Sequence, residues 1–162
     1  MQVSDLIRYN HFVRGLYLDA LARLPWAEVL ANMGLSFDSM RDVFLHLTLV
    51  EDRWIGYIIP GRIKEWVNPD FDTFKDMDSL KRYADEVKVR TEAYLCKISD
   101  KELERQVNVH WGEKTTDIPV EKGLMHMVIE DMIHYGELSA VFWQKGLEAP
   151  YSGFWRFRFT NP

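Results

Sequence analysis

The chain has 162 residues, the length of one ordinary domain with a hydrophobic core of its own, so we expect a single domain over residues 1–162. Its net charge of −5, with lysine and arginine scattered along the chain, argues against a binder of nucleic acids or other polyanions. A single cysteine, Cys96, excludes an intramolecular disulfide, and the absence of a signal pattern or an apolar run of about 18 residues predicts a cytoplasmic protein outside the membrane.

The first two helices are predicted from the spacing of apolar side chains. Between residues 4 and 24 such side chains recur every three or four positions, as on one face of an amphipathic helix, and Pro25 ends this pattern. The connection that follows has room for one helical turn. The same period returns over residues 37–59, where Pro60 closes it. Two amphipathic helices, over residues 4–24 and 37–59, are therefore expected in the first part of the chain.

A long connection separates the second helix from the third. Residues 62–75 show no sustained period and are predicted to form a crossover loop. The helical period resumes over residues 78–98, and the third helix is placed there. Ser99 and Glu102 then have the spacing of a capping box, which predicts a short helical turn.

The last third of the chain changes period twice. Apolar and polar residues alternate over residues 107–111, and a glycine turn connects them to 115–119, so a small β-hairpin is predicted. A fourth helix is expected over residues 120–145, with Gly146 ending it. The aromatic and cationic tail, residues 150–162, is expected to pack on the bundle or on a second subunit. The predicted fold is an all-α four-helix bundle with long crossover connections and a small β-hairpin before the last helix.

A candidate metal site follows from the fourth helix. Glu130 and His134 are four residues apart, so both side chains leave the same face of that helix, roughly one turn from each other. His46 lies on the inward stripe of the second helix, and helices that pack 8 to 10 Å apart can bring such a side chain within reach. Two histidines and one carboxylate leave coordination positions open, as a catalytic metal site requires.

Several polar residues can be explained by structural roles that do not involve a metal. A histidine on an apolar helix face can be a hydrogen-bonded core residue, and this alternative stays open for the three candidates. The same choice, between a position next to the site and a satisfied core residue, applies to two residues on the same face of the fourth helix, His126 and Glu137. A solvated face is predicted for Glu51, Asp52 and Arg53, and a solvent-facing or pocket-rim position for His11 and His110. Trp54 is interpreted as a core residue.

Two segments resemble a known protein family. The run from His46 to Trp54 is similar to the His, Glu and Trp pattern in the second helix of the DinB/YfiT-like metalloenzymes, also described as thiol-dependent S-transferases. The run from His134 to Ala140 is similar to that family's His-Arg-Gly-Gln-Leu-Ser motif. The resemblance covers about residues 3–146. It implies a bundle with crossover connections, a divalent metal between the second and fourth helices, and often a homodimer.

Glu130 departs from the commonest pattern of that family, in which a histidine stands at this position. A glutamate there is similar to the mycothiol-dependent maleylpyruvate isomerase branch, which usually has an additional C-terminal domain, so neither substrate nor thiol is carried over. The resemblance implies that a divalent metal (zinc, nickel, iron or manganese) lowers the pKa of a low-molecular-weight thiol and presents the thiolate to an electrophile. Glu130 would lower the positive charge at the metal and favour iron or manganese somewhat more than a third histidine would.

Two function hypotheses follow. The first is a metal-dependent enzyme that acts on a small-molecule substrate, transferring or isomerising it through a thiol adduct, without assigned catalytic residues beyond the metal ligands. The second is a noncatalytic bundle for binding or assembly, in which internal hydrogen bonds satisfy the polar trio and the aromatic tail forms an interface. Neither hypothesis involves nucleic acid or a membrane, and a homodimer is the expected assembly.

Overall fold

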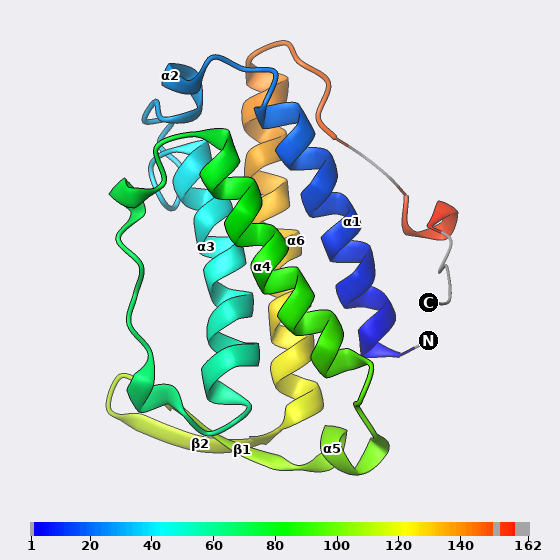
Figure 1. Ribbon diagram of the computed structural model, residues 1–162. Helices are drawn as coiled ribbons and strands as arrows, with labels where there is room; N and C mark the ends of the chain where they lie inside the picture. Colours follow the sequence, from blue (N-terminus) through cyan, green and yellow to red (C-terminus); the bar gives the residue numbers. More distant parts are fainter. Residues whose placement is uncertain (1, 151–152, 158–162) are drawn as a thin grey trace.

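Four long helices packed side by side make up the body of the computed structural model, which describes residues 2–150 and 153–157 (Figure 1). They are α1 (Val3–Leu21), α3 (Met40–Arg53), α4 (Met77–Leu95) and α6 (Val120–Gln144). Both α1 and α3 pack against α4 and α6, so α1 and α3 lie on one diagonal of the bundle. The all-α bundle predicted from the sequence is confirmed.

The helix directions explain the long crossover. In Figure 1, α1 and α6 run upward, whereas α3 and α4 run downward. Because α3 and α4 are consecutive and parallel, the chain must return along the whole bundle between them. This connection contains two short 3-10 turns, Ile63–Glu65 and Phe71–Thr73. The sequence predicted the crossover but not these turns.

The second helix differs from its prediction at both ends. It begins later than residue 37, because the Ser39 side chain caps it by accepting a hydrogen bond from the Asp42 backbone N–H at 3.1 Å. Its α-helical part ends at Arg53, and the chain continues as a π-helix over Trp54–Ile58. The wider turn is closed by the hydrogen bond from the Ile59 backbone N–H to the Trp54 carbonyl at 3.0 Å.

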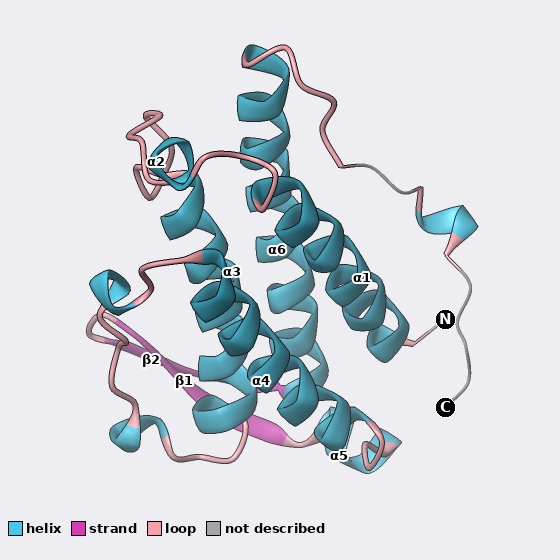
Figure 2. Cartoon of the chain, turned by 45° about the horizontal axis from the view of Figure 1, so that its top comes forward, coloured by secondary structure: helices cyan, strands magenta, loops and turns pink. Residues whose placement is uncertain are grey.

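The short elements gather at the two ends of the bundle. At one end lies α2 (Trp26–Val29), and at the other lie α5 (Asp100–Glu104) and the predicted hairpin. The hairpin consists of β1 (Gln106–Trp111) and β2 (Lys114–Pro119), which pair antiparallel and cross the ends of α3 and α6 (Figure 2). Because β2 leads directly into α6, the hairpin is held against the helix end.

A layer of polar side chains divides the core into two apolar clusters. One cluster includes Tyr17 of α1 and Leu138 of α6, and the other includes Ile7 of α1 and Leu124 of α6. Between them along the helices lie buried polar residues from all four: Asn10, His11, Arg14, Thr48, Glu51, Thr91, Asp131 and His134. No helix in the described ranges is long and apolar enough to cross a membrane.

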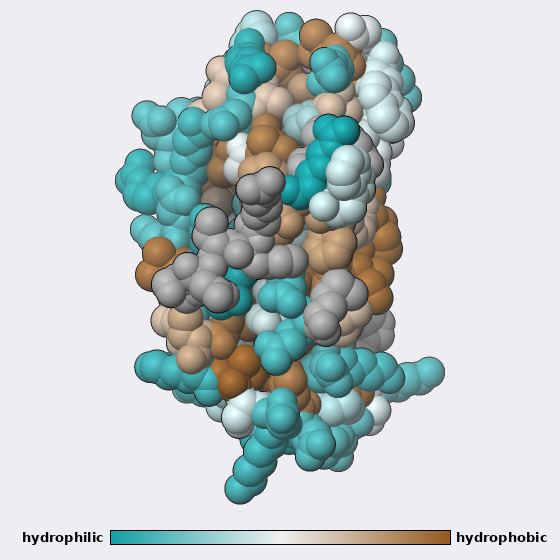
Figure 3. All heavy atoms as spheres, turned by 90° about the vertical axis from the view of Figure 1, so that its right-hand side faces the viewer, coloured by the Kyte–Doolittle hydropathy of each residue, from teal (hydrophilic) through white to brown (hydrophobic). Residues whose placement is uncertain are grey.

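The described part of the C-terminal tail packs on α1 of the same chain. The ring of Tyr9 contacts those of Phe154 and Phe157, with centroids 5.0 and 5.6 Å apart, and Phe12 contacts Phe157 at 5.3 Å. On this face of the molecule, brown apolar residues are interspersed with teal polar ones (Figure 3). The tail therefore packs on the bundle as predicted, while residues 151–152 and 158–162 lie outside the described part.

Candidate metal site

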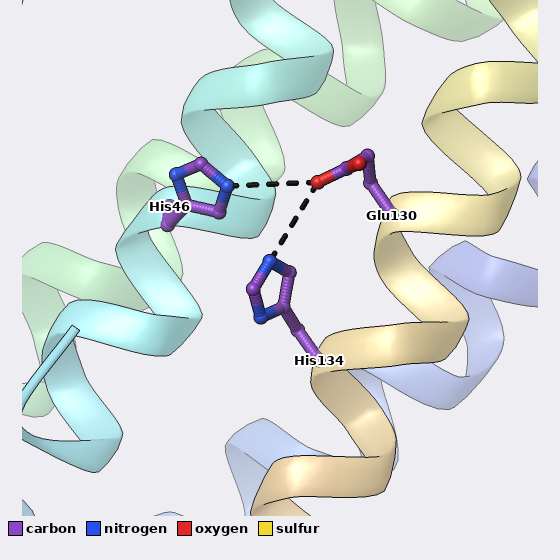
Figure 4. Close-up of side chains that lie close together, drawn as sticks. All are labelled: His46, Glu130 and His134. Atoms are coloured by element: carbon purple, nitrogen blue, oxygen red, sulfur yellow. Dashed lines mark ion pairs between the residues drawn. The ribbon is translucent and has the colours of Figure 1, made fainter. Parts of the chain in front are cut away.

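Three side chains converge between α3 and α6, as the sequence predicted. His46 comes from α3, whereas Glu130 and His134 come from successive turns of α6 and point toward it (Figure 4). The Oε2 atom of Glu130 lies 3.8 Å from Nε2 of His46 and 3.6 Å from Nε2 of His134. One donor atom from each residue lies within 4.8 Å of the other two.

This spacing is compatible with a single divalent ion. Metal bonds to imidazole nitrogen and carboxylate oxygen are about 2.0 to 2.2 Å long, so donors around one ion are roughly 3 to 4 Å apart. The Glu130 contacts to the two imidazoles fall in that range. The donor nitrogens of His46 and His134 lie within 4.8 Å of each other. The donor set of two nitrogens and one oxygen suits zinc, nickel, iron or manganese.

Glu137 fixes the ring of His134. The Nδ1 atom of His134 donates to Oε2 of Glu137 at 2.6 Å, which leaves the lone pair of Nε2 facing Glu130. Ser36 holds Glu137 in turn, donating from its backbone N–H at 3.2 Å and its hydroxyl at 2.8 Å. Burial acts to raise the pKa of Glu137, but the hydrogen bonds from His134 and Ser36 outweigh burial and hold the pKa below its ordinary value. Glu137 therefore lies next to the site as a carboxylate.

The ring of His46 is held by packing. Phe37 stacks on it with ring centroids 4.0 Å apart, and the ring of His134 stands edge-on to it at 4.9 Å. Burial, together with the nearby His134, lowers the pKa of His46, and the attraction of Glu130 only partly offsets this. A lowered pKa keeps the imidazole neutral, which is the form that binds a metal.

His126 is not a buried core residue, contrary to the simpler interpretation of the sequence. Its side chain is 43% exposed, and its Nε2 atom lies 4.0 Å from Oε1 of Glu130. Its ring stands 5.5 Å from that of Trp54, which is buried as predicted. His126 therefore forms part of the surface next to the three converging side chains.

An apolar pocket of about 410 Å³ opens beside these residues. Its walls come from α3, the π-helical segment, both strands of the hairpin and α6. His46, His126 and Glu130 lie on the wall, with Leu49, Val50, Trp54, Ile58, Val109 and Ile118 as the apolar lining. This volume and this mixture of apolar walls with a few polar groups are typical of small-molecule sites.

The predicted solvated face of α3 is wrong at Glu51 and Asp52. Glu51 is 2% exposed and forms ion pairs with His11 at 2.8 Å and Arg14 at 2.7 Å. Asp52 is also buried and accepts a hydrogen bond from the Tyr83 hydroxyl at 2.9 Å. His11, predicted to face solvent or a pocket rim, is likewise buried. These pairings join different helices, so no spacing within one segment reveals them.

The fold and the site together define a class: a four-helix bundle with a candidate metal centre of two histidines and one carboxylate between facing helices. The model of the DinB family matches residues 1–160, and the chain belongs to that family. This match confirms the resemblance inferred from the two histidine-containing segments. No curated protein sequence matched the chain.

Proposed function

We propose that His46, Glu130 and His134 bind one divalent metal ion, and that the protein transfers or isomerises a small molecule through a low-molecular-weight thiol. The observation that carries this proposal is the convergence of three donor atoms within 4.8 Å beside an apolar pocket of about 410 Å³. Membership of the DinB family supports it, since the resemblance to that family implies a divalent metal between the second and fourth helices.

The residues around the metal ligands have separate roles in the proposed function. Glu137 and Phe37 hold the two imidazoles in place, so little reorganisation is needed on binding. Glu130 brings a negative charge that a third histidine would lack. The bound metal would supply the Lewis acidity that lowers the pKa of a thiol. The apolar walls of the pocket keep water away from the thiolate and hold the electrophile.

Metal content tests the three ligands. Protein purified without a histidine tag is expected to hold up to one equivalent of divalent metal, measured by elemental analysis. His46→Ala and His134→Ala should each reduce this content at least about tenfold, because each removes one of three ligands. His110→Ala is the control, since His110 lies on the pocket wall but is not one of the three converging donors, and hydrogen-bonds Thr115 at 2.9 Å. Full occupancy in both ligand variants would refute the proposed site.

An assay of catalytic turnover distinguishes the proposed enzyme from the alternative of a noncatalytic binding or assembly protein. A panel of low-molecular-weight thiols and electrophiles should reveal thiol consumption that depends on the metal and is lost in His46→Ala. An absence of turnover across a broad panel would favour the binding or assembly function. The choice of thiol and electrophile is left to this experiment.

A homodimer is also proposed, with α6 as the interface. The outward face of this helix carries four exposed apolar side chains, three of them within about one turn and the fourth about three turns further on: Ile129, Met132, Ile133 and Trp143. Gly136 and Ala140 lie on the same stripe and leave room for a second helix to approach. An apolar stripe of this kind on an otherwise amphipathic helix is typical of a protein interface.

A further inference from the structure

The pocket beside the candidate metal site carries an excess of positive charge in its lining. Two cationic side chains, Arg53 and Lys122, line it, against one carboxylate, Glu130. The carboxylate oxygens of Glu130 lie 3.6 to 4.0 Å from histidine nitrogens, and no ion pair joins Glu130 to either cation. The charge of Arg53 and Lys122 is therefore not cancelled within the pocket wall.

Arg53 differs from the other arginines that the bundle partly or fully buries. Arg14 pairs with Glu51 and Asp131, and Arg41 pairs with Asp42 at 2.7 Å. The Nε atom of Arg53 is buried without a hydrogen-bond acceptor in the described part of the chain, as is that of Arg14, but the Arg14 guanidinium is held by two ion pairs. No described carboxylate forms an ion pair with the Arg53 guanidinium. An arginine whose donors lack acceptors within the protein can donate hydrogen bonds to a ligand instead.

We propose that this pocket binds a small apolar molecule carrying a carboxylate, and that Arg53 receives the carboxylate. A guanidinium presents its N–H groups in a planar fork, which matches the two oxygens of a carboxylate. The apolar part of the molecule lies against Trp54, Ile58 and Ile118. This inference rests on the proposed function, because the ligand so held is the electrophile next to the metal.

The position of Arg53 in the fold supports a role in specificity. It is the last residue of α3, directly before the π-helical turn that places Trp54 and Ile58 in the pocket wall. His46 lies seven residues earlier, two turns along the same face of the helix. One helix thus supplies both a candidate metal ligand and the carboxylate anchor. A bound molecule would be oriented along α3 with its anionic end away from Glu130.

Binding of phenylacetate and of its neutral analogue phenylacetamide tests the inference. The two probes have almost the same shape and differ in charge. Titration of the full-length protein, followed by NMR of nitrogen-labelled arginine side chains, should show phenylacetate binding about tenfold more tightly than the amide. The Arg53 Nε–H resonance should shift with phenylacetate. Arg53→Gln should abolish the preference, and Arg53→Lys should keep only part of it because lysine lacks the planar fork.

Arg23→Gln is the matched control, since Arg23 is exposed and lies outside the pocket. A preference for phenylacetate that survives in Arg53→Gln would place the carboxylate on the metal or on Lys122 and overturn the inference. If Arg53→Gln does not fold, as judged by circular dichroism, an unchanged Arg53 Nε–H resonance in the wild-type titration overturns it instead.

Metal content, measured on the same samples, separates this inference from the proposed function. An Arg53-dependent preference in protein that holds no metal upholds the carboxylate site and refutes the metal site. Bound metal without an Arg53-dependent preference refutes only the carboxylate site.

Discussion

Glu51 is the residue on which the buried polar layer depends. One of its oxygens accepts hydrogen bonds from His11 and Thr91, and the other pairs with Arg14. These partners come from α1 and α4, so the Glu51 carboxylate connects three helices across the boundary between the two apolar clusters. Burial alone would raise its pKa, but Arg14, His11 and Thr91 outweigh burial and hold the pKa far below the ordinary value of 4.5.

The depressed pKa gives a prediction for Glu51→Gln. Removing one partner of a buried ion pair costs about 3 to 5 kcal/mol, so the variant should melt roughly 10 °C lower at pH 7. Above pH 4.5, the pKa of Glu51 in the unfolded chain, its carboxylate contributes fully to the stability of the fold. Below this pH the unfolded chain binds a proton at Glu51 while the folded protein does not, so the contribution is progressively lost. Thermal melts should therefore show the gap between variant and wild type narrowing below about pH 4.5.

Glu86→Gln serves as the control for this experiment. Glu86 is exposed on α4, so its replacement should leave the melting temperature nearly unchanged at every pH. A Glu51→Gln gap that stays constant between about pH 3 and 7 would contradict the coupling of Glu51 to its cationic partners.

Residue spacing predicted one polar cluster and missed the other for a physical reason. Glu130 and His134 lie one turn apart on α6, so their proximity follows from helix geometry alone. His11 and Glu51 are 40 residues apart in sequence, and only the packing of α1 against its neighbours brings them together. Glu137 is intermediate: its three-residue distance from His134 made the contact possible, but Ser36 had to be placed by the fold.

At the scale of the elements, the contact between α6 and the π-helical segment shapes the pocket. The ring of Trp54 lies against Gly123, where a Cβ atom would stand only 2.5 Å from the Cζ3 atom of the ring. Glycine at this position lets the indole enter between α3 and α6, where it is 7% exposed. The same ring then forms part of the pocket wall.

We therefore predict that Gly123→Ala destabilises the protein although alanine favours helix formation. Alanine gains up to about 1 kcal/mol of helix propensity, whereas displacing a packed indole costs about 1 to 3 kcal/mol. Gly15→Ala in α1 is the matched control, because nothing lies within 4 Å of its Cβ position, and it should raise the melting temperature by a few degrees. Calorimetry that shows both variants equally stabilised would contradict the close contact with Trp54.

Secondary-structure elements were predictable from the sequence where the regular spacing of apolar residues within one segment identifies a helix or a strand. The four long helices and the hairpin each repeat a single spacing over several residues, and the structure confirms all five. The π-helix was not predictable, because Trp54 and Ile58 satisfy the α-helical period equally well and the change is visible only in the backbone hydrogen bond of Ile59. The pocket was missed for a related reason, since its walls combine residues 46–58 with residues 109–130, and only the fold brings these two stretches together.

At the scale of the whole molecule, the remaining question is what covers the outer face of α6. Ile133 is 56% exposed and Trp143 is 67% exposed, and both point away from the core of the bundle. A specific dimer buries about 800 Å² per subunit, and a stripe that extends along much of a 25-residue helix offers a surface of suitable length. A second copy, related by twofold symmetry, would bury the same residues on both sides.

Ile133→Glu tests this interface. Dimer formation would transfer the introduced carboxylate from water into an apolar interface, and this desolvation has a large unfavourable free energy. The Ile133→Glu variant should therefore be monomeric where the wild type is dimeric. Val89→Glu is the matched control, because Val89 is 68% exposed on α4, on the opposite diagonal corner of the bundle from α6. Light scattering after size-exclusion chromatography should give twice the chain mass of 19.2 kDa for the wild type and for Val89→Glu, and the single chain mass for Ile133→Glu. A monomeric wild type, or a dimer that survives in Ile133→Glu, would mean that the α6 face is not the interface.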